Sequence, residues 1–217
     1  AFLVEQSAHW TLPTHFHQEH QFQLFVAGGG TIGKRPVEPL AVHYASPHSG
    51  YGPLVSAGEG IAYLTLRAVG DTGAWYLPEE RENNLRIPKV QAHGAPQERV
   101  SAQALAGLPS ATVEVLIAPA GDGPAAWLLR LGAGQQVAQP QGQALGGGRF
   151  VVVTQGSLRL DGGEVGALGV AWLDPADTLA LHAGALGLEA AVLQFPKQAA
   201  QSFVEGSRTE AAGAGAA

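Results

Sequence analysis

Apolar residues gather in short segments along the chain. The segments are rich in Val, Leu and aromatic residues and are bounded by clusters of Gly and Pro: 21–27, 61–67, 112–117, 126–131, 150–154, 170–173 and 188–195. Short apolar runs between Gly and Pro clusters are typical of β-strands joined by tight turns. Helical periodicity is scarce, and only 78–85, which begins at a proline, and 101–108 favour helices. The pattern therefore predicts an all-β chain with short helices between two strand-rich regions.

The chain also repeats itself. The segment 15–28 corresponds to 139–156, and further on 62–67 matches 190–195 about 128 residues later. The spacings agree if the second copy carries four additional residues, which 144–148 can supply. An internal repeat of this kind indicates two copies of one β unit. Because the first copy has a much shorter stretch before its matching segment, we expect it to lack one strand.

The repeat divides the chain into two domains. We expect an N-terminal domain at 1–70 and a C-terminal domain at 111–200. Between them, 71–110 carries both candidate helices and several prolines, so it is the expected linker. Residues 201–217 end in a low-complexity Ala and Gly stretch and form the expected tail.

The amino-acid composition argues against several classes of function. Charged residues make up 14% of the chain, and 12 Lys and Arg stand against 18 Asp and Glu, for a net charge of −6. A chain without a basic excess is poorly suited to neutralising phosphates, so nucleic acid is not an expected partner. The absence of Cys excludes disulfides, iron–sulfur clusters and thiol nucleophiles.

Neither a membrane nor an export route is indicated. No apolar run free of charges reaches the ~18 residues of a membrane span. The first residues show no basic segment followed by an apolar stretch, which makes the cytoplasm the expected location. The chain begins at Ala1 rather than Met, which leaves open an export signal removed before that residue.

Histidines are concentrated near the N-terminus. Six of the eight lie within the first 48 residues: His9, His15, His17, His20, His43 and His48. On a β-strand alternate side chains share a face, which groups His15, His17, Glu19, Gln21 and Gln23. These residues cannot form a dry core, because each unpaired buried polar group costs on the order of 1–3 kcal/mol. We expect the face to be wet or to surround an ion, and two imidazoles of a His-x-His pair can reach one metal at about 2.1 Å.

These residues resemble the first motif of the cupin superfamily, G-x5-H-x-H-x3,4-E-x6-G. The chain reads His15-Phe16-His17, has Gln21 at the glutamate position and reaches Gly28 after six further residues. The resemblance implies a jelly-roll barrel and a divalent transition metal held by His15, His17 and Gln21. Glu19, on the same face, is an alternative source of a carboxylate.

The family's second motif, G-x5-P-x-G-x2-H-x3-N, supplies a further histidine. It falls on 39–53 of this chain, and the histidine position lies at or beside Tyr51. Two residues compete for the role of third imidazole, His48 in the adjacent turn and His43 on the preceding strand. His48 is favoured because its turn lies nearest to the expected position. Glu19, Gln23 and Tyr51 are expected to line a substrate pocket.

The second copy lacks these ligands. Gln139 and Gln141 stand at the two histidine positions, Arg149 stands at the glutamate position, and the strand at 169–175 carries no histidine. Glutamine and arginine form a poor set of ligands. The resemblance therefore implies a bicupin, with two tandem cupin-type jelly-roll barrels of which the second has lost its metal.

Two functional hypotheses follow from the resemblance. The first is a metal-binding bicupin, with the activity of an Fe-type oxygenase on a small organic molecule as its catalytic form. Fe, Ni, Zn, Mn and Cu all remain open as the metal. The alternative is a non-catalytic protein that binds a small molecule. A homodimer is also expected, because Phe16, Phe22 and Leu24 lie on the outer face of the histidine-bearing strand.

Overall fold

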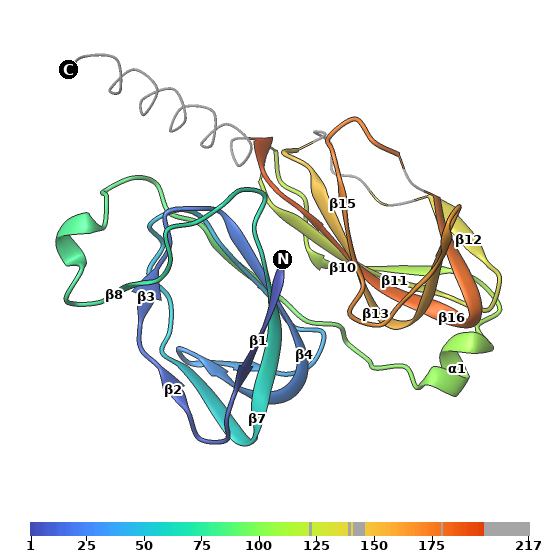
Figure 1. Cartoon of the computed structure of the whole chain (residues 1–217), viewed down its shortest axis with the longest axis horizontal. Helices are drawn as coiled ribbons and strands as arrows, with labels where there is room; N and C mark the ends of the chain where they lie inside the picture. Colours follow the sequence, from blue (N-terminus) through green and yellow to red (C-terminus); the bar gives the residue numbers. More distant parts are fainter. Residues whose placement is uncertain (122, 139, 141–145, 179, 198–217) are drawn as a thin grey trace.

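The computed structural model describes residues 1–121, 123–138, 140, 146–178 and 180–197, which form two β-domains that lie side by side (Figure 1). The first domain contains β1 (Phe2–Gln6), β2 (Thr11–Leu12), β3 (His15–Phe16), β4 (Gln21–Ile32), β5 (Arg35–Val37), β6 (Val42–Ala45), β7 (Leu54–Leu66), β8 (Trp75–Tyr76), the 3-10 turn η1 (Arg81–Asn83) and β9 (Gln91–Gly94). The second contains α1 (Ala102–Ala106), β10 (Thr112–Ile117), β11 (Ala125–Leu131), β12 (Gln136–Ala138), β13 (Arg149–Leu160), β14 (Gly163–Gly166), β15 (Val170–Leu173) and β16 (Ala180–Gln194).

Each domain is built on one large antiparallel sheet. The first sheet has the order β1-β7-β4-β6-β9, with β2 beside β7 and β5 beside β4. The second has the order β10-β11-β16-β13-β14, with β12 beside β16 and β15 beside β13. All seven apolar segments predicted as strands fall on strands, which confirms the predicted all-β class with two tandem barrels. Of the two expected helices, 101–108 contains α1, whereas 78–85 holds only η1, which buries no side chain against the barrel.

The repeat is visible in the pairing of the central strands. β4 pairs with β7 in the first domain as β13 pairs with β16 in the second. β1 then occupies the place of β11, because each flanks the long strand of its sheet. Among the described strands, β10 on the far side of β11 has no counterpart beside β1. The first copy therefore lacks a counterpart of β10, as its short N-terminal stretch predicts, but β9 beside β6 brings its large sheet to the same seven strands as the second.

Two glycines hold matching positions in the two copies. Gly28 has φ 66° and Gly156 has φ 72°. A Cβ atom at Gly28 would lie 2.1 Å from the carbonyl oxygen of Gly60, and one at Gly156 would lie 2.1 Å from that of Gly187. Only glycine allows the two strands to approach this closely with positive φ.

Gly28→Ala and Gly156→Ala are each expected to lower the free energy of unfolding by about 2–3 kcal/mol, because each combines a left-handed backbone with a clash. Urea denaturation measures both. Gly70→Ala is the matched control, since a Cβ atom there meets nothing within 4 Å. Equal stability of Gly70→Ala and Gly28→Ala would contradict the assignment of the close strand crossing.

The stretch 71–110 does more than connect the domains. Strand β8 pairs with β3, and strand β9 pairs with β6, so residues after position 70 complete the first domain. Helix α1 packs against β16 in the second domain, and the Ser101 side chain caps its first turn at Ala104. The described part of the linker is thus divided between the two barrels.

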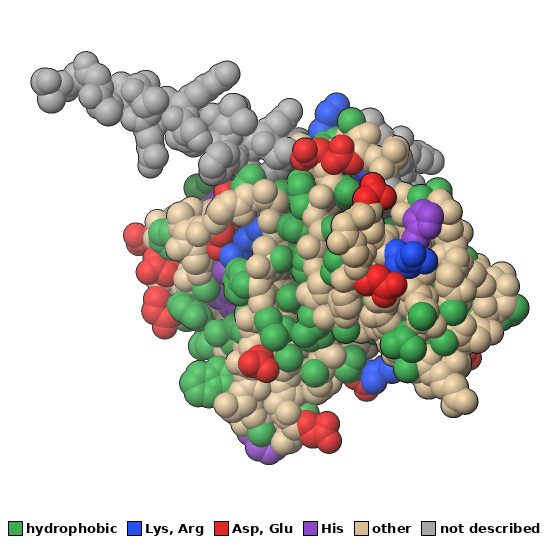
Figure 2. All heavy atoms as spheres, turned by 45° about the vertical axis from the view of Figure 1, so that its right-hand side comes forward, with side chains coloured by type: hydrophobic (Ala, Val, Ile, Leu, Met, Phe, Trp, Pro, Cys, Tyr) green, Lys and Arg blue, Asp and Glu red, His purple; other side chains and the backbone are tan. Residues whose placement is uncertain are grey.

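The outer faces of the two sheets meet in a shared apolar core. It contains Phe22, Leu24, Leu40, Val42, Tyr44, Leu64 and Leu66 from the first domain, and Leu116, Ile117, Ala126, Leu128, Phe150, Val152, Ala191, Leu193 and Phe195 from the second. Phe22 and Leu24, which motivated the expected homodimer, are fully buried against the second domain of the same chain. Apolar side chains remain exposed over the face shown in Figure 2, with charged side chains interspersed among them.

Candidate functional site

Two buried histidines lie inside the first barrel. His15 is 2% exposed and His17 is 8% exposed. His15 forms an isolated antiparallel bridge with Tyr51, and its ring centroid lies 5.2 Å from that of His17. Phe16, between them, faces the other way and packs against Trp75. The alternation predicted for the His-x-His strand therefore brings the two imidazoles together.

Both histidines are held through their Nδ1 atoms. His15 Nδ1 donates to the carbonyl oxygen of Pro13 at 2.8 Å, and His17 Nδ1 donates to Oδ2 of Asp71 at 2.8 Å. Since each acceptor lacks a hydrogen of its own, Nδ1 of each ring carries a proton. In the neutral ring of His15 the Nε2 atom then carries a lone pair. Burial lowers the pKa of His15 to about 4, which keeps its ring neutral at pH 7.

Arg67 fixes the orientation of Gln21. The Nη2 and Nε atoms of Arg67 donate to Oε1 of Gln21 at 2.8 and 3.1 Å. The amide nitrogen of Gln21 consequently faces Tyr51 and donates to its hydroxyl. Tyr51 in turn donates to Nε2 of His15 at 3.0 Å. A continuous chain of donors therefore runs from Arg67 through Gln21 and Tyr51 to His15.

Asp71 holds Arg67 and His17 in place. Its side chain is fully shielded from solvent, and Oδ2 accepts from Nδ1 of His17 at 2.8 Å and forms an ion pair with Nη1 of Arg67 at 3.1 Å. Burial alone would raise the pKa of Asp71, but the hydrogen bond from His17 and the charge of Arg67 outweigh it and lower that pKa. The carboxylate is thus ionised at neutral pH and neutralises the Arg67 guanidinium.

The network borders a cavity of about 270 Å³. Its polar lining residues are His15, His17, Gln21, Gln23, Tyr51, Thr65 and Arg67. The remaining lining residues are largely apolar: Phe2, Val4, Leu12, Tyr63, Gly73, Ala74 and Tyr76. Of the three residues expected to line a pocket, Gln23 and Tyr51 do so, whereas Glu19 is half-buried before β4 and does not line the cavity.

His43 and His48 lie outside this cavity. His43 is fully buried behind Tyr51, its Nδ1 donates to Oε1 of Gln23 at 2.8 Å, and its ring stacks on His93 at 4.5 Å. His48 has φ 58° in its turn, and its ring packs on the outward side of Phe16. Neither imidazole joins His15 and His17. The side chain at the predicted third position is Tyr51 itself.

Acid is expected to destabilise the fold through His43. Burial, with a smaller contribution from the charge of His93, lowers the pKa of His43 to about 3, against about 6.5 for an unfolded histidine. The unfolded chain therefore binds the proton first, so this stability is present above pH 6.5 and is lost as pH falls toward 3. The loss from His43 alone is about 2 kcal/mol at pH 5.

Urea denaturation at pH 8, 6.5 and 5 measures this slope. His43→Gln is expected to make the slope shallower by that amount, while His9→Gln, at an exposed position, leaves it unchanged. An identical slope in the wild type and in His43→Gln would show that burial of His43 has no part in the acid response.

The donor set does not fit a four-ligand metal site. The cavity lining has two imidazole Nε2 atoms, but Gln21 presents an N–H group to Tyr51 instead of a carboxylate, and the Tyr51 hydroxyl is hydrogen-bonded to both Gln21 and His15. Arg67 Nη2 lies 3.1 Å from Nδ1 and 3.3 Å from Nε2 of His17, so a positive charge stands against the ring of one of the two histidines. Within the described residues, no three His, Asp or Glu side chains come together as metal ligands.

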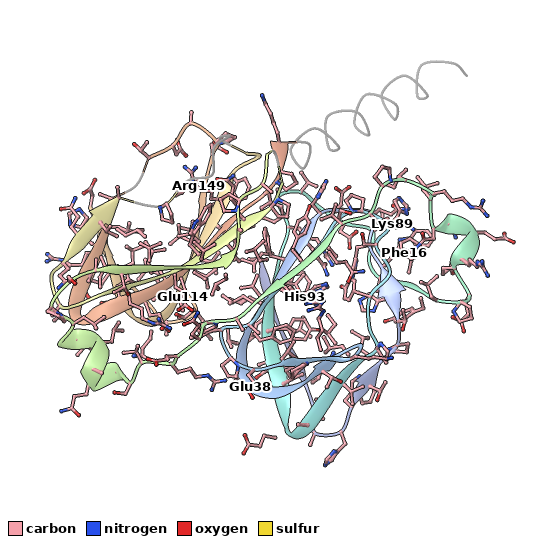
Figure 3. All side chains as sticks on the ribbon, turned by 180° about the vertical axis from the view of Figure 1, so that it is seen from behind. Phe16, Glu38, Lys89, His93, Glu114 and Arg149 are labelled. Carbon is pink, nitrogen blue, oxygen red and sulfur yellow. The ribbon has the colours of Figure 1, made fainter. Side chains whose placement is uncertain are left out.

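The described residues of the second barrel give it an apolar interior. Its interior holds an apolar cluster that includes Trp127, Leu129, Val151, Val192 and Leu188. Arg149, at the position equivalent to Gln21, is fully buried at one end of this barrel and donates to the carbonyl oxygen of Asp177 at 2.6 Å (Figure 3). Gln139 and Gln141 lie outside the described residues.

Solved structures share this two-barrel architecture. The chain is similar to nickel-bound bacterial pirin YhhW from Escherichia coli (12% identity, TM-score 0.53, covering 89% of this chain and 79% of that one). It is also similar to quercetin 2,3-dioxygenase from Acinetobacter baumannii (14%, TM-score 0.53, 91% and 73%). Oxalate decarboxylase from Bacillus subtilis matches with 12% identity, TM-score 0.57 and coverage of 90% and 67%. No protein-family model and no curated protein sequence matches.

These comparisons confirm the fold that the sequence predicts. The chain is a two-domain protein of cupin fold, a bicupin. At this identity the likeness extends to the fold alone. The described residues include no helix long and apolar enough to cross a membrane.

Proposed function

We propose that the first barrel binds a small organic molecule in its cavity, with the hydrogen-bonded network of Arg67, Gln21, Tyr51 and His15 in place of a metal centre. The cavity lining combines polar with apolar side chains, as small-molecule sites commonly do. This function corresponds to the ligand-binding alternative for a bicupin rather than to its metal-dependent form.

The observation that carries the proposal is the position of Arg67. Its guanidinium contacts both Gln21 and His17, two of the residues expected to hold a metal. A divalent ion 4 Å from a guanidinium would be repelled by roughly 8 kcal/mol at an effective dielectric constant of about 20, of which Asp71 would offset only a part. The acceptor atoms Oε1 of Gln21 and Nε2 of His15 already have donors.

Elemental analysis and thermal shift test the proposal together. Protein purified without chelators, then reconstituted with Fe, Mn, Ni or Zn, is expected to retain much less than one metal ion per chain. Members of a panel of small acids, amides, alcohols and amines are expected to raise the melting temperature equally with and without EDTA. One tightly bound metal per chain that disappears in His15→Ala and His17→Ala would overturn the metal-independent site.

A metal-dependent oxygenase is the second candidate function, and one observation favours it. Both histidines use Nδ1 for a carbonyl or carboxylate acceptor and keep Nε2 for another partner, which is how metal-ligating histidines are commonly oriented. The nickel-bound pirin and the quercetin dioxygenase share the fold. A divalent transition metal, whether Fe, Ni, Zn, Mn or Cu, would then bind His15 and His17, with Arg67 displaced. Oxygen consumption by the iron-loaded protein with aromatic and diketone compounds, lost in His17→Ala, would favour this candidate.

A further inference from the structure

Arg67 is the one charged side chain among the described residues that line the cavity. Its side chain keeps 14% of its accessible surface. A guanidinium has five N–H groups. The contacts with Gln21 and His17 use the N–H groups on Nε and Nη2, whereas Nη1 forms an ion pair with Asp71 at 3.1 Å and can still donate to a ligand.

The charges around Arg67 are arranged asymmetrically. The carboxylate that balances it, Asp71, is fully shielded and does not line the cavity. No Asp or Glu is present among the described lining residues. A ligand inside the cavity can therefore contact the guanidinium of Arg67 directly, whereas the compensating carboxylate of Asp71 is outside the cavity lining. This arrangement favours a ligand that brings an acceptor with negative charge, because a guanidinium pairs most strongly with a carboxylate.

The apolar lining residues define the rest of the ligand. They include the side chains of Phe2, Val4, Leu12, Tyr63 and Tyr76. The Phe2 ring centroid lies 5.6 Å from Cζ of Arg67, so the apolar lining begins beside the cation. A volume of about 270 Å³ is at the lower end for ligand sites and suits a molecule with a single ring.

We infer that the cavity of the first barrel takes a small monocarboxylate with one apolar ring, its carboxylate on Arg67 and its ring against Phe2, Val4 and Tyr63. This inference rests on the proposed function and names the class of molecule that the same site binds. Asp71 acts as a positioning residue, since it holds Arg67 and His17 without lining the cavity.

Calorimetric titration of the full chain with two matched probe pairs tests the inference. The pairs are benzoate with benzamide and phenylacetate with phenylacetamide, each titrated with and without EDTA. Each acid is expected to bind at least tenfold more tightly than its amide. Arg67→Lys keeps the charge and loses the forked geometry, so it is expected to weaken acid binding about tenfold and to leave amide binding nearly unchanged. Circular dichroism establishes that the variant is folded.

Arg86→Gln is the control, because Arg86 is exposed and borders a separate cationic surface pocket with Arg81 and Lys89. Unchanged acid binding in Arg86→Gln supports the inference. A loss of acid binding in Arg86→Gln but not in Arg67→Lys would overturn the inference, because the carboxylate would then bind at the surface pocket. Equal binding of acids and amides would also overturn it while leaving the proposed function intact.

Two further results separate the inference from the function on which it rests. Acid binding that disappears with EDTA would overturn both, because the carboxylate would then contact a metal. If neither probe pair binds, the monocarboxylate class is wrong. The proposed function fails as well only if no member of the wider panel shifts the melting temperature.

Discussion

Asp71→Leu is expected to lower the free energy of unfolding by about 3–5 kcal/mol, because it removes one partner of a buried charge pair. The remaining guanidinium of Arg67 would keep its charge in the barrel without a counterion. The ring of His17 would also lose the acceptor for Nδ1. Urea denaturation measures the loss, and titration with phenylacetate is expected to show no binding by the folded fraction, since Arg67 and His17 are no longer held in place.

Asp71→Asn removes the charge of the side chain but keeps its shape, so it distinguishes the two contributions to stability. The amide carbonyl can still accept from His17, so the expected loss of stability is smaller, about 1–3 kcal/mol. Glu164→Leu is the matched control in the second domain, because its contact with Arg159 is between exposed side chains at 3.7 Å and such pairs contribute about 0–1 kcal/mol. If Asp71→Leu were no more destabilising than Glu164→Leu, Asp71 would have no part in organising the site.

The sequence was sufficient to predict the inward face of the first barrel. Alternation along a strand depends only on local geometry, so the sharing of one interior by His15 and His17 follows from their spacing. The second motif, although broken, still identified the position of Tyr51 opposite His15. Glu19 failed as a pocket residue because β4 begins only at Gln21, and strand alternation does not extend through the preceding turn.

Arg67 and Asp71 could not be found in the same way. Arg67 follows β7, and Asp71 lies in the loop after it, about fifty residues from the histidines that they contact. Their role depends on how β7 pairs with β4, which no local pattern encodes. The internal repeat gives no signal for Arg67 either. Leu66 pairs with Phe22 as Leu193 pairs with Phe150, so Arg67 corresponds to Gln194, one residue before the position that the predicted spacing of about 128 indicates.

The third-imidazole alternatives show the limit of spacing arguments. His48 was close in sequence to the expected position, but its turn directs the ring onto the outward side of Phe16. His43 lies on β6, as the prediction of a preceding strand requires, but its ring lies behind that of Tyr51 and does not reach His15 and His17. Both outcomes depend on packing that was determined by distant residues, including His93 on the linker strand β9.

The outward residues of the histidine strand lead to the second major prediction. Phe22 and Leu24 lie on the face predicted to pair with another copy, yet the second domain of the same chain covers them. The homodimer stays a prediction, but the apolar face on which it was based is covered by the second domain. The ring of Phe22 meets that of Phe195 edge to face, with centroids 5.0 Å apart. This contact joins the two barrels directly, because the two residues belong to different domains.

Phe22→Ala is expected to cost about 3–5 kcal/mol in the free energy of unfolding, because it opens a cavity in the core that both domains share. Calorimetry is expected to show one transition for the wild type and a second, separate transition in the variant as the domains lose their coupling. Light scattering of the wild type reports whether copies associate, independently of this contact.

A double-mutant cycle distinguishes the domain contact from general loss of core. Phe22→Leu and Phe195→Leu are expected to show a coupling of about 0.5–1.5 kcal/mol, the range for aromatic pairs in contact. Phe25→Leu with Phe195→Leu is the matched control, since Phe25 is equally buried but belongs to the separate core of the first barrel. Because aromatic coupling requires contact, the control pair is expected to be additive within about 0.5 kcal/mol. Additivity in both pairs would mean that the barrels are held together by other contacts.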